Sequence, residues 1–276
     1  MTNTIADHYA ADRLLASIEA GMAAIGKSPS TVSVADLGPV DEFHVGGRSA
    51  TTELCDQLGA TPDGRLLDVG CGIGGTARFI ASTVGSHVTG LDITPGYIDV
   101  ARTLSEWTGL DELNRFEVGS ALDMPFDDHS FDGATQLHVG MNIADKAALF
   151  TEVYRVLRPG GSFGVYDIMR TDEQPFDFPV PWANDESASS VAGVGTYRDG
   201  LQAAGFELGA ERNRREFAIE FFTAMRERTA QQGGPPPLGL HVIIGADTPT
   251  KMANLVGALV AGTLAPVEMI CHKPAA

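Results

Sequence analysis

Two aspartates and a run of glycines in the first third of the chain have the types and spacing of a nucleotide-binding site. Residues 66–69 form a short apolar run, typical of a buried parallel strand, and end in a glycine-rich turn at residues 70–75. A helix is expected to begin at Thr76. Glycines let a ligand approach the backbone, and the free N–H groups of a helix N-terminus attract anions. The turn therefore predicts a nucleotide site.

The position of the acids distinguishes two kinds of ligand for this turn. Gly70, Gly72 and Gly75 satisfy the GxGxxG spacing of dinucleotide-binding folds, which by itself is a weak signal for NAD(P). Asp68 lies two residues before the first glycine, where a carboxylate would pair with a cationic amino group and not with a pyrophosphate. A second apolar strand ends in Asp92, 22 positions after Gly70, where a ribose-binding carboxylate is expected. The acids favour a nucleoside that carries an amino group, and NAD(P) is the alternative.

Alternating strands and helices over residues 64–168 must position these side chains. This alternation predicts a parallel sheet with right-handed crossovers, whose carboxyl-terminal edge binds ligands. The loop after the third strand, at residues 119–126, should pass the base of the nucleotide. The end of the fourth strand, residues 136–142, should point into the same crevice and bring His138 to the ligand.

Four motifs resemble a known family. LLDVGCGIGG, VTGLDIT, GSALDMPF followed by SFD, and EVYRVLRPGG, in this order and spacing, resemble class I S-adenosylmethionine (SAM)-dependent methyltransferases of the small-molecule type. The resemblance is specific over residues 60–170. The segments FHVGG, LHVGMNI and FPVPW resemble the sarcosine/dimethylglycine and natural-product methyltransferases. The resemblance implies an α/β, Rossmann-like, seven-stranded sheet with strand order 3-2-1-4-5-7-6, an antiparallel strand 7 and an N-terminal helical cap.

The resemblance also implies a cofactor and its contacts. The cofactor would be SAM, with S-adenosylhomocysteine (SAH) as product and no metal. The chain departs from the family pattern at Ser120, where many relatives carry an acid whose side chain contacts the adenine amino group. The residues assigned to the cofactor are Asp68, Gly70, Cys71, Gly72, Gly74, Asp92, Ile93, Ser120, Ala121, Leu122 and Gln136.

The chain is predicted to divide at residue 60. Residues 1–60 form a helical cap or lid, which begins with an amphipathic helix over residues 5–25, and residues 61–276 form the methyltransferase domain. Such a cap usually closes over the site, so His44 and Tyr9 are expected to face the ligand. A histidine on a surface loop is the alternative for His44.

The part of the chain after the fifth strand is assigned to the substrate. Residues 172–190 are polar and interrupted by prolines, yet they carry aromatic side chains, which suggests a pocket wall or a loop pinned by its aromatics. The predicted substrate-binding residues are Met141, Tyr166, Phe178, Trp182 and His241.

Methyl transfer from a sulfonium makes modest demands on catalytic side chains. The site must hold the nucleophile ~3 Å from the methyl carbon and exclude water. A general base is needed when the nucleophile carries a proton of high pKa. His138, His44 and Tyr9 are assigned this role. The acceptor stays open between a small amine and a C- or O-acceptor on an aromatic metabolite, and a SAM-binding protein without catalysis is the remaining alternative.

Composition limits the partners. The 276 residues include 36 acidic and 19 basic side chains, for a formal charge of −17, which argues against nucleic acid and anionic membranes. The seven histidines and three cysteines show no metal-ligand spacing. No signal peptide opens the sequence, and the apolar run at 255–267 is too short to cross a bilayer. We expect a cytoplasmic enzyme with a small-molecule substrate, and a homodimer is an open expectation.

Overall fold

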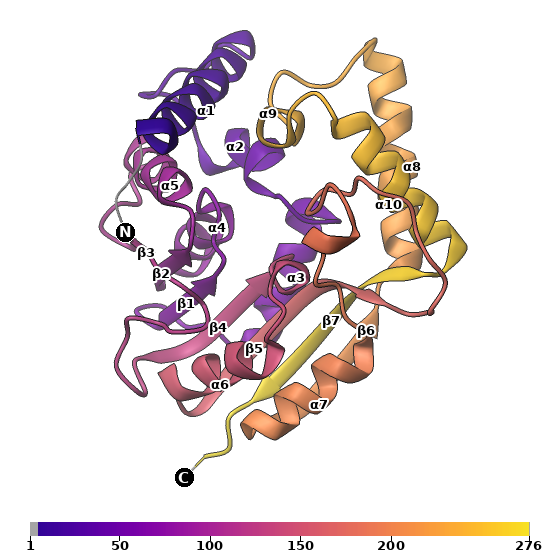
Figure 1. The fold of residues 1–276 in the computed structure, drawn as a ribbon. Coiled ribbons are helices and arrows are strands. Elements are labelled where there is room, and N and C mark those ends of the chain that lie inside the picture. The colour runs from indigo at the N-terminus through magenta and orange to yellow at the C-terminus, as the bar shows by residue number, and fades with distance from the viewer. Residues whose placement is uncertain (1–4, 276) are drawn as a thin grey trace.

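In residues 5–275, which the computed structural model describes (side chains from residue 11 onward), seven strands form one mixed sheet of order β3-β2-β1-β4-β5-β7-β6 (Figure 1). β7 runs antiparallel to both β5 and β6. This order and the antiparallel β7 confirm the predicted fold class. The strands are β1 (Arg65–Val69), β2 (His87–Asp92), β3 (Asn114–Val118), β4 (Phe131–Leu137), β5 (Leu157–Arg170), β6 (Glu207–Asn213) and β7 (Leu264–His272).

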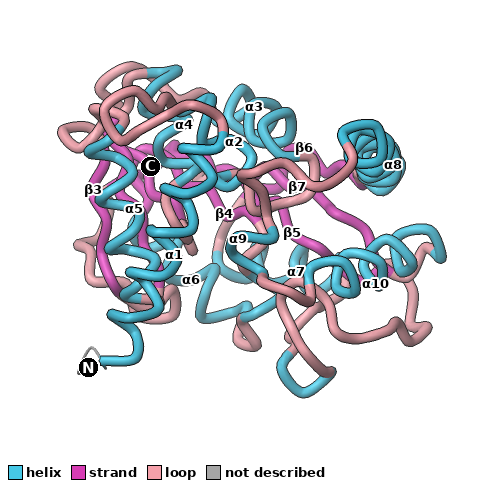
Figure 2. The backbone as a smooth tube through the Cα atoms, turned by 90° about the horizontal axis from the view of Figure 1, so that it is seen from above, coloured by secondary structure: helices cyan, strands magenta, loops and turns pink. Residues whose placement is uncertain are grey.

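Helices cover both faces of this sheet (Figure 2). Residues 66–69 of β1 are all buried, as expected for an apolar strand with both faces covered. Leu66 packs with side chains of α4 and α5, and the next residue, Leu67, packs with those of α6 and α7. The helices on the two faces are α3 (Gly47–Leu58), α4 (Gly75–Val84) and α5 (Pro95–Trp107), and α6 (Lys146–Val156) and α7 (Val194–Ala204).

The first two helices share a core with the cofactor half of the sheet. α1 (Ile5–Ala24) and α2 (Val34–Asp41) bury Ile18, Met22 and Leu37 against α5 and the glycine turn. Ile25, the last residue of the helix predicted over residues 5–25, lies directly after α1 and is 41% exposed. The described part of the cap is therefore packed into the body of the protein. Tyr9 lies in α1, but its side chain is outside the described residues.

A buried ion pair attaches α2 to α4. Arg78 and Asp41 are both buried, and the guanidinium meets the carboxylate through Nη2–Oδ1 (2.5 Å) and Nε–Oδ2 (3.2 Å). Gly75, the first residue of α4, has no room for a side chain because a Cβ would collide with the carbonyl oxygen of Asp41. The cap thus meets the cofactor helix backbone to backbone at this point.

Residues 214–263, between β6 and β7, form a helical insert above the carboxyl-terminal edge of the sheet (Figure 1). The insert contains α8 (Arg215–Gln232), α9 (His241–Ile244) and α10 (Thr248–Ala261). Apolar side chains of α8 and α10 pack on β5, β7 and Met141, whereas Val242 and Ile243 of α9 pack with the core of α1 and α2. α3, which the predicted division assigns to the cap, instead packs on β5 through Leu54.

The loop after β5 rests on this insert. Asn254 of α10 donates a hydrogen bond from Nδ2 to the carbonyl oxygen of Pro179 (2.9 Å). Within the described residues, no helix is both long enough and apolar enough to cross a membrane.

Candidate functional site

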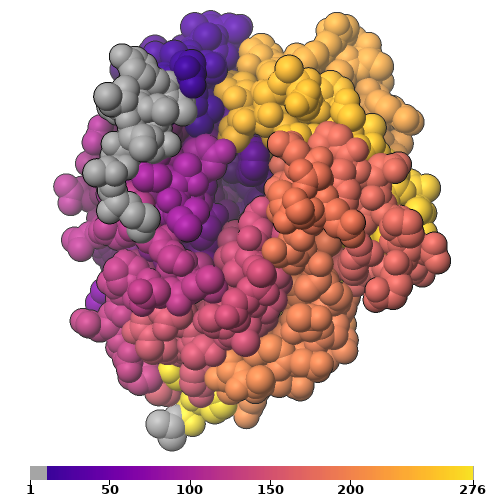
Figure 3. All heavy atoms as spheres, viewed as in Figure 1, coloured from indigo at the N-terminus to yellow at the C-terminus, as the bar shows by residue number. Residues whose placement is uncertain are grey.

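A cavity of about 670 Å³ opens at the carboxyl ends of β1, β2 and β4. In Figure 3 it appears as the hollow at the centre of the view, between the segment around β2 and α5 and the loop after β5. Its walls come from the strand ends, from residues 41–45 after α2, from the loop at 181–182, and from the helical insert. Two chemically different halves result, a polar one on the glycine turn and an apolar one on the insert.

The glycine turn leaves its open side to the cavity. Gly72 has a φ of +54° and no atom within 4 Å of a Cβ position, so the backbone presents an unobstructed face. Gly70, Cys71 and Gly72 line the cavity. Gly74, also assigned to the cofactor, does not line it.

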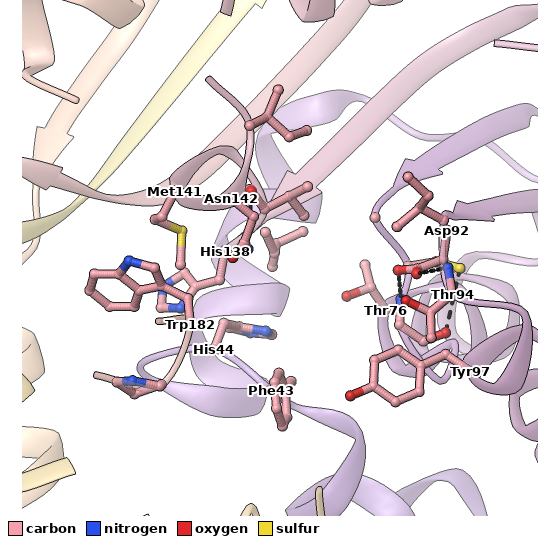
Figure 4. Close-up of a pocket in the computed structure, with 18 of the residues that line it drawn as sticks. Phe43, His44, Thr76, Asp92, Thr94, Tyr97, His138, Met141, Asn142 and Trp182 are labelled. Atoms are coloured by element: carbon pink, nitrogen blue, oxygen red, sulfur yellow. Dashed lines mark hydrogen bonds between the residues drawn. The ribbon is translucent and has the colours of Figure 1, made fainter. Parts of the chain in front are cut away.

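Asp92 holds the end of β2 against the turn. Its carboxylate accepts hydrogen bonds from the amide of Gly72 (3.0 Å, Oδ2) and from the amide of Thr94 (2.8 Å, Oδ1). The side chain lines the cavity on the same side as Tyr97 (Figure 4). The carboxylate is thus fixed in place by two amides while one side remains open to a ligand.

Asp68 presents an unsatisfied carboxylate oxygen. Its Oδ1 accepts a hydrogen bond from the Thr135 hydroxyl (2.8 Å), whereas Oδ2 is buried without a partner in the described residues. Burial, together with the nearby charges of Asp92 and Glu42, raises the pKa of Asp68 to about 7. A cationic amino group would supply the missing partner of Oδ2. The residues present therefore fit the amino-acid part of SAM.

The loop after β3 supplies an apolar surface beside Asp92. Ile93 and Leu122 both line the cavity, and their side chains are 69% and 41% exposed. Ala121 and Ser120 also line it, and the Ser120 hydroxyl oxygen accepts a hydrogen bond from the amide of Leu122 (3.1 Å). Exposed aliphatic side chains at a pocket mouth suit the faces of a planar base.

Gln136 is placed differently from its predicted contact. Its side chain is fully buried, donates from Nε2 to Asp167 Oδ2 (2.6 Å), and is absent from the cavity lining. Asp167 also accepts hydrogen bonds from the amides of Val139 (2.7 Å) and Gly140 (3.1 Å). Gln136 and Asp167 therefore shape the turn after β4 from behind, a role that the sequence analysis did not assign to either residue.

His44 and His138 meet in the middle of the cavity, between Trp182 and Met141 on one side and Asp92 and Tyr97 on the other (Figure 4). The imidazole centroids are 6.0 Å apart. β4 ends at Leu137, and His138 adopts a left-handed φ of +56°. The direction of its side chain is therefore set by the turn after β4 and not by the alternation of side chains along the strand.

Burial keeps both imidazoles neutral. It lowers the pKa of His44 to about 4 and the pKa of His138 well below its usual range. His138 Nε2 is buried without a hydrogen-bond partner in the described residues. Tyr166 packs behind both rings, with centroids 6.2 Å from His44 and 5.4 Å from His138, and it does not line the cavity. Neutral imidazoles are available as hydrogen-bond acceptors or bases at pH 7.

The predicted substrate residues separate into two groups. Met141 and Trp182 line the cavity. Phe178 instead packs on Phe176 (4.8 Å between centroids), and His241 lies at the start of α9 outside the lining. The sequence analysis missed most of the apolar residues that line the cavity, because no motif or local spacing marks them. They are Phe43, Val45, Pro181, Phe221, Phe222, Leu240, Ile243, Ile244, Met252 and Leu255.

The carboxylates of the cavity are separate from one another and have suitable partners in the groups of a nucleoside cofactor. In the part of the chain whose side chains are described, no group of three or more His, Cys, Asp or Glu could hold a metal ion. Residues 67–165 match the family model described as a methyltransferase domain. The resemblance to class I SAM-dependent methyltransferases is thereby confirmed.

Several curated relatives are named sterol methyltransferases. The sterol 24-C-methyltransferase ERG6B of Gibberella zeae is 40% identical over 119 residues, which are 43% of this chain and 31% of that protein. The matched part spans less than half the length of each of the first curated relatives.

Two solved structures share the fold over most of the chain. The (4+2)-cyclase SpnF superposes with a TM-score of 0.68 at 20% identity, covering 98% of this chain and 96% of its own. A candidate sarcosine dimethylglycine methyltransferase from Galdieria sulphuraria has a TM-score of 0.66 at 21% identity, covering 82% and 86%. At these identities the likeness establishes the fold, and the acceptor has to be argued from the cavity.

Proposed function

We propose that this protein transfers the methyl group of SAM to an apolar small-molecule acceptor by in-line displacement. The observation that carries the proposal is the chemical division of one cavity. Carboxylates and glycine amides occupy one half, and apolar side chains surround two neutral histidines in the other. When bound, SAM supplies an electrophilic methyl carbon on a sulfonium.

The polar half has groups suited to each part of the cofactor. Asp68 Oδ2 would pair with the amino group, and Asp92, already held by two amides, would bind the ribose hydroxyls. Ile93 and Leu122 would pack on the base. These contacts fix the orientation of the cofactor, so the reacting carbon would face the histidines, and an oriented pair of reactants accounts for much of the rate in such a displacement.

The apolar half favours a hydrophobic acceptor over a small zwitterionic amine. Phe43, Met141, Trp182 and Phe222 would lie along its surface, whereas a small amine would leave most of this lining without contacts. The sterol methyltransferase relatives, by their names, also act on an apolar molecule. We therefore place the acceptor among terpenoid, sterol-like or aromatic natural products with one polar group at the histidines.

The same proposal covers metal use, cellular location and partners. The carboxylates of the cavity have roles toward the cofactor, so we propose a reaction that uses no metal. The strongly acidic composition supports a cytoplasmic enzyme that binds neither membranes nor nucleic acid, and a homodimer stays a prediction for size measurement in solution.

The test is SAM-dependent release of SAH in the presence of panels of apolar hydroxyl compounds, alkenes and small amines. We expect turnover with an apolar compound, and stabilisation against heat by SAM but not by NAD. His138→Asn, which tolerates the left-handed φ, should keep SAM affinity within about threefold and slow methyl transfer by ~10²-fold if His138 acts as a base. Turnover confined to small amines would contradict the proposed acceptor class.

A further inference from the structure

The ring nitrogen Nε2 of His44 faces three oxygen atoms. It lies 2.9 Å from the Thr51 hydroxyl, 3.3 Å from the carbonyl oxygen of Gly47, and 3.4 Å from Glu42 Oε2. His44, Thr51 and Glu42 are all buried. A carbonyl oxygen only accepts hydrogen bonds, so the contact with Gly47 favours the ring that carries its proton on Nε2.

The Thr51 hydroxyl leads to the same assignment independently. It lies 2.6 Å from Glu42 Oε2 and donates its one proton there. The other carboxylate oxygen, Oε1, is 2.5 Å from Nε of Arg48. Burial raises the pKa of Glu42, whereas the Thr51 hydrogen bond and this ion pair act against that rise and favour the ionised carboxylate. Since the Thr51 proton is directed to Glu42, the Thr51 oxygen accepts from His44 Nε2.

The other ring nitrogen, Nδ1, is then the unprotonated one. His44 lines the cavity, and Nδ1 has no hydrogen bond to any described residue. The titratable groups that face the imidazole are Glu42 and Arg48 from its own side, His138 from the end of β4, and Tyr166 from β5. None of these occupies Nδ1, so its lone pair is available to a ligand.

We propose that Glu42 and Thr51 are positioning residues that hold His44 as the Nε2–H tautomer, so that Nδ1 accepts the proton which the nucleophilic atom of the acceptor loses. This inference rests on the proposed methyl transfer and adds the class of acceptor group, a hydroxyl or another group that bears a removable proton. The proton passes to Nδ1, the electron pair left on the nucleophile forms the bond to the methyl carbon, and the pair of the carbon–sulfur bond stays on sulfur. Glu42 then stabilises the imidazolium through Thr51.

A direct readout of the tautomer needs no substrate. In protein labelled with ¹⁵N-histidine, the imidazole nitrogen signals of His44 should show a neutral Nε2–H ring from pH 6 to pH 8. Thr51→Val removes the hydroxyl while keeping the shape of the side chain, and it should reduce the ratio of Nε2–H to Nδ1–H by ~10-fold, the scale of one lost hydrogen bond. Thr51→Ser should restore the ratio.

Kinetics with an apolar acceptor supply the second readout. Thr51→Val should slow single-turnover methyl transfer by ~10- to 100-fold, with the SAM dissociation constant unchanged within about threefold, and Thr51→Ser should recover most of the rate. Thr52→Val is the matched control, because the Thr52 hydroxyl donates to the carbonyl of Arg48 and does not contact His44.

The outcomes separate this inference from the proposed function. A wild-type His44 that is Nδ1–H or charged at pH 7 overturns the inference, and so does a Thr51→Val protein with an unchanged tautomer ratio and rate. If Thr51→Val fails to fold, the wild-type spectrum and Thr51→Ser still decide the tautomer. An Nε2–H ring in a protein that methylates no acceptor would refute the proposed function and leave the tautomer assignment standing.

Discussion

Asp68 is the residue whose ionisation should control cofactor affinity. In the free protein, burial raises its pKa to about 7, so the carboxyl group is largely protonated at pH 6. Pairing with a cationic amino group requires the carboxylate, and the complex therefore binds fewer protons than the free protein. Affinity for SAM should rise as the pH increases toward 7 and level off above it.

The expected slope is about tenfold per pH unit between pH 5.5 and 6.5, measured as the SAM dissociation constant by calorimetry. Asp68→Asn should bind SAM more weakly and lose this pH dependence. An unchanged slope in Asp68→Asn would assign the titration to another group.

Asp92 should matter through its charge-assisted contacts. Asp92→Ala should weaken SAM binding by ~1.5–3 kcal/mol, the scale of a lost hydrogen bond to a charged group. The substitution also frees the amides of Gly72 and Thr94. The matched control is Asp99→Ala in α5, whose carboxylate is nearly half exposed and lies 3.6 Å from Arg102. Equal affinities for the two variants by calorimetry would remove Asp92 from the cofactor site.

At the scale of elements, the ion pair between α2 and α4 decides how firmly the cap is attached. Arg78→Met leaves the buried carboxylate of Asp41 without its partner, which typically costs about 3–5 kcal/mol. We expect a loss of this size in the free energy of unfolding, measured with urea. The double variant Asp41→Leu with Arg78→Met should recover part of it, because no buried charge is left alone.

The control for this prediction is an exposed ion pair. Arg158 bridges Asp132 with both side chains more than 40% exposed, so Arg158→Met should change the free energy of unfolding by less than about 1 kcal/mol. Similar losses for Arg78→Met and Arg158→Met would show that the buried pair does not hold the cap.

At the scale of the whole molecule, the cap is part of the core. A lid that only closes over the site could be removed from a protein that stays folded, but Ile18, Met22, Leu37 and Val40 are fully buried, so we expect folding to require residues 1–40. Roughly 1.5–3 kcal/mol accompanies the burial of each such side chain, and a typical domain has a net stability of about 5–15 kcal/mol.

Deletion of residues 1–40 should therefore yield a protein without a cooperative unfolding transition and with little near-UV circular dichroism. Ile25→Ala, at an exposed residue directly after α1, should leave unfolding nearly unchanged and serves as the control for a substitution near the cap that removes no buried contact. A truncated protein that unfolds cooperatively would restore the interpretation of the cap as a removable lid.

The sequence by itself determined the features that depend on neighbours in the chain. The buried strand, the glycine turn and the helix start at residues 66–76 follow from apolar runs and backbone freedom, and Asp68 and Asp92 take their places because strand ends of a parallel sheet share one edge. The strand order followed from the family resemblance. His138 reaches the cavity because it directly follows β4, and His44 reaches it from the segment after α2, which the sequence analysis placed in the cap over the site.

Tertiary structure decided where side chains point once distant segments meet. Gln136 turns inward because Asp167, 31 residues later, accepts its amide proton. Phe178 and His241 pack outside the cavity, whereas Phe221 and Phe222 of the insert line it. No local period encodes these choices, since they depend on which buried polar group finds a partner and which apolar face is covered by a segment far away in the sequence.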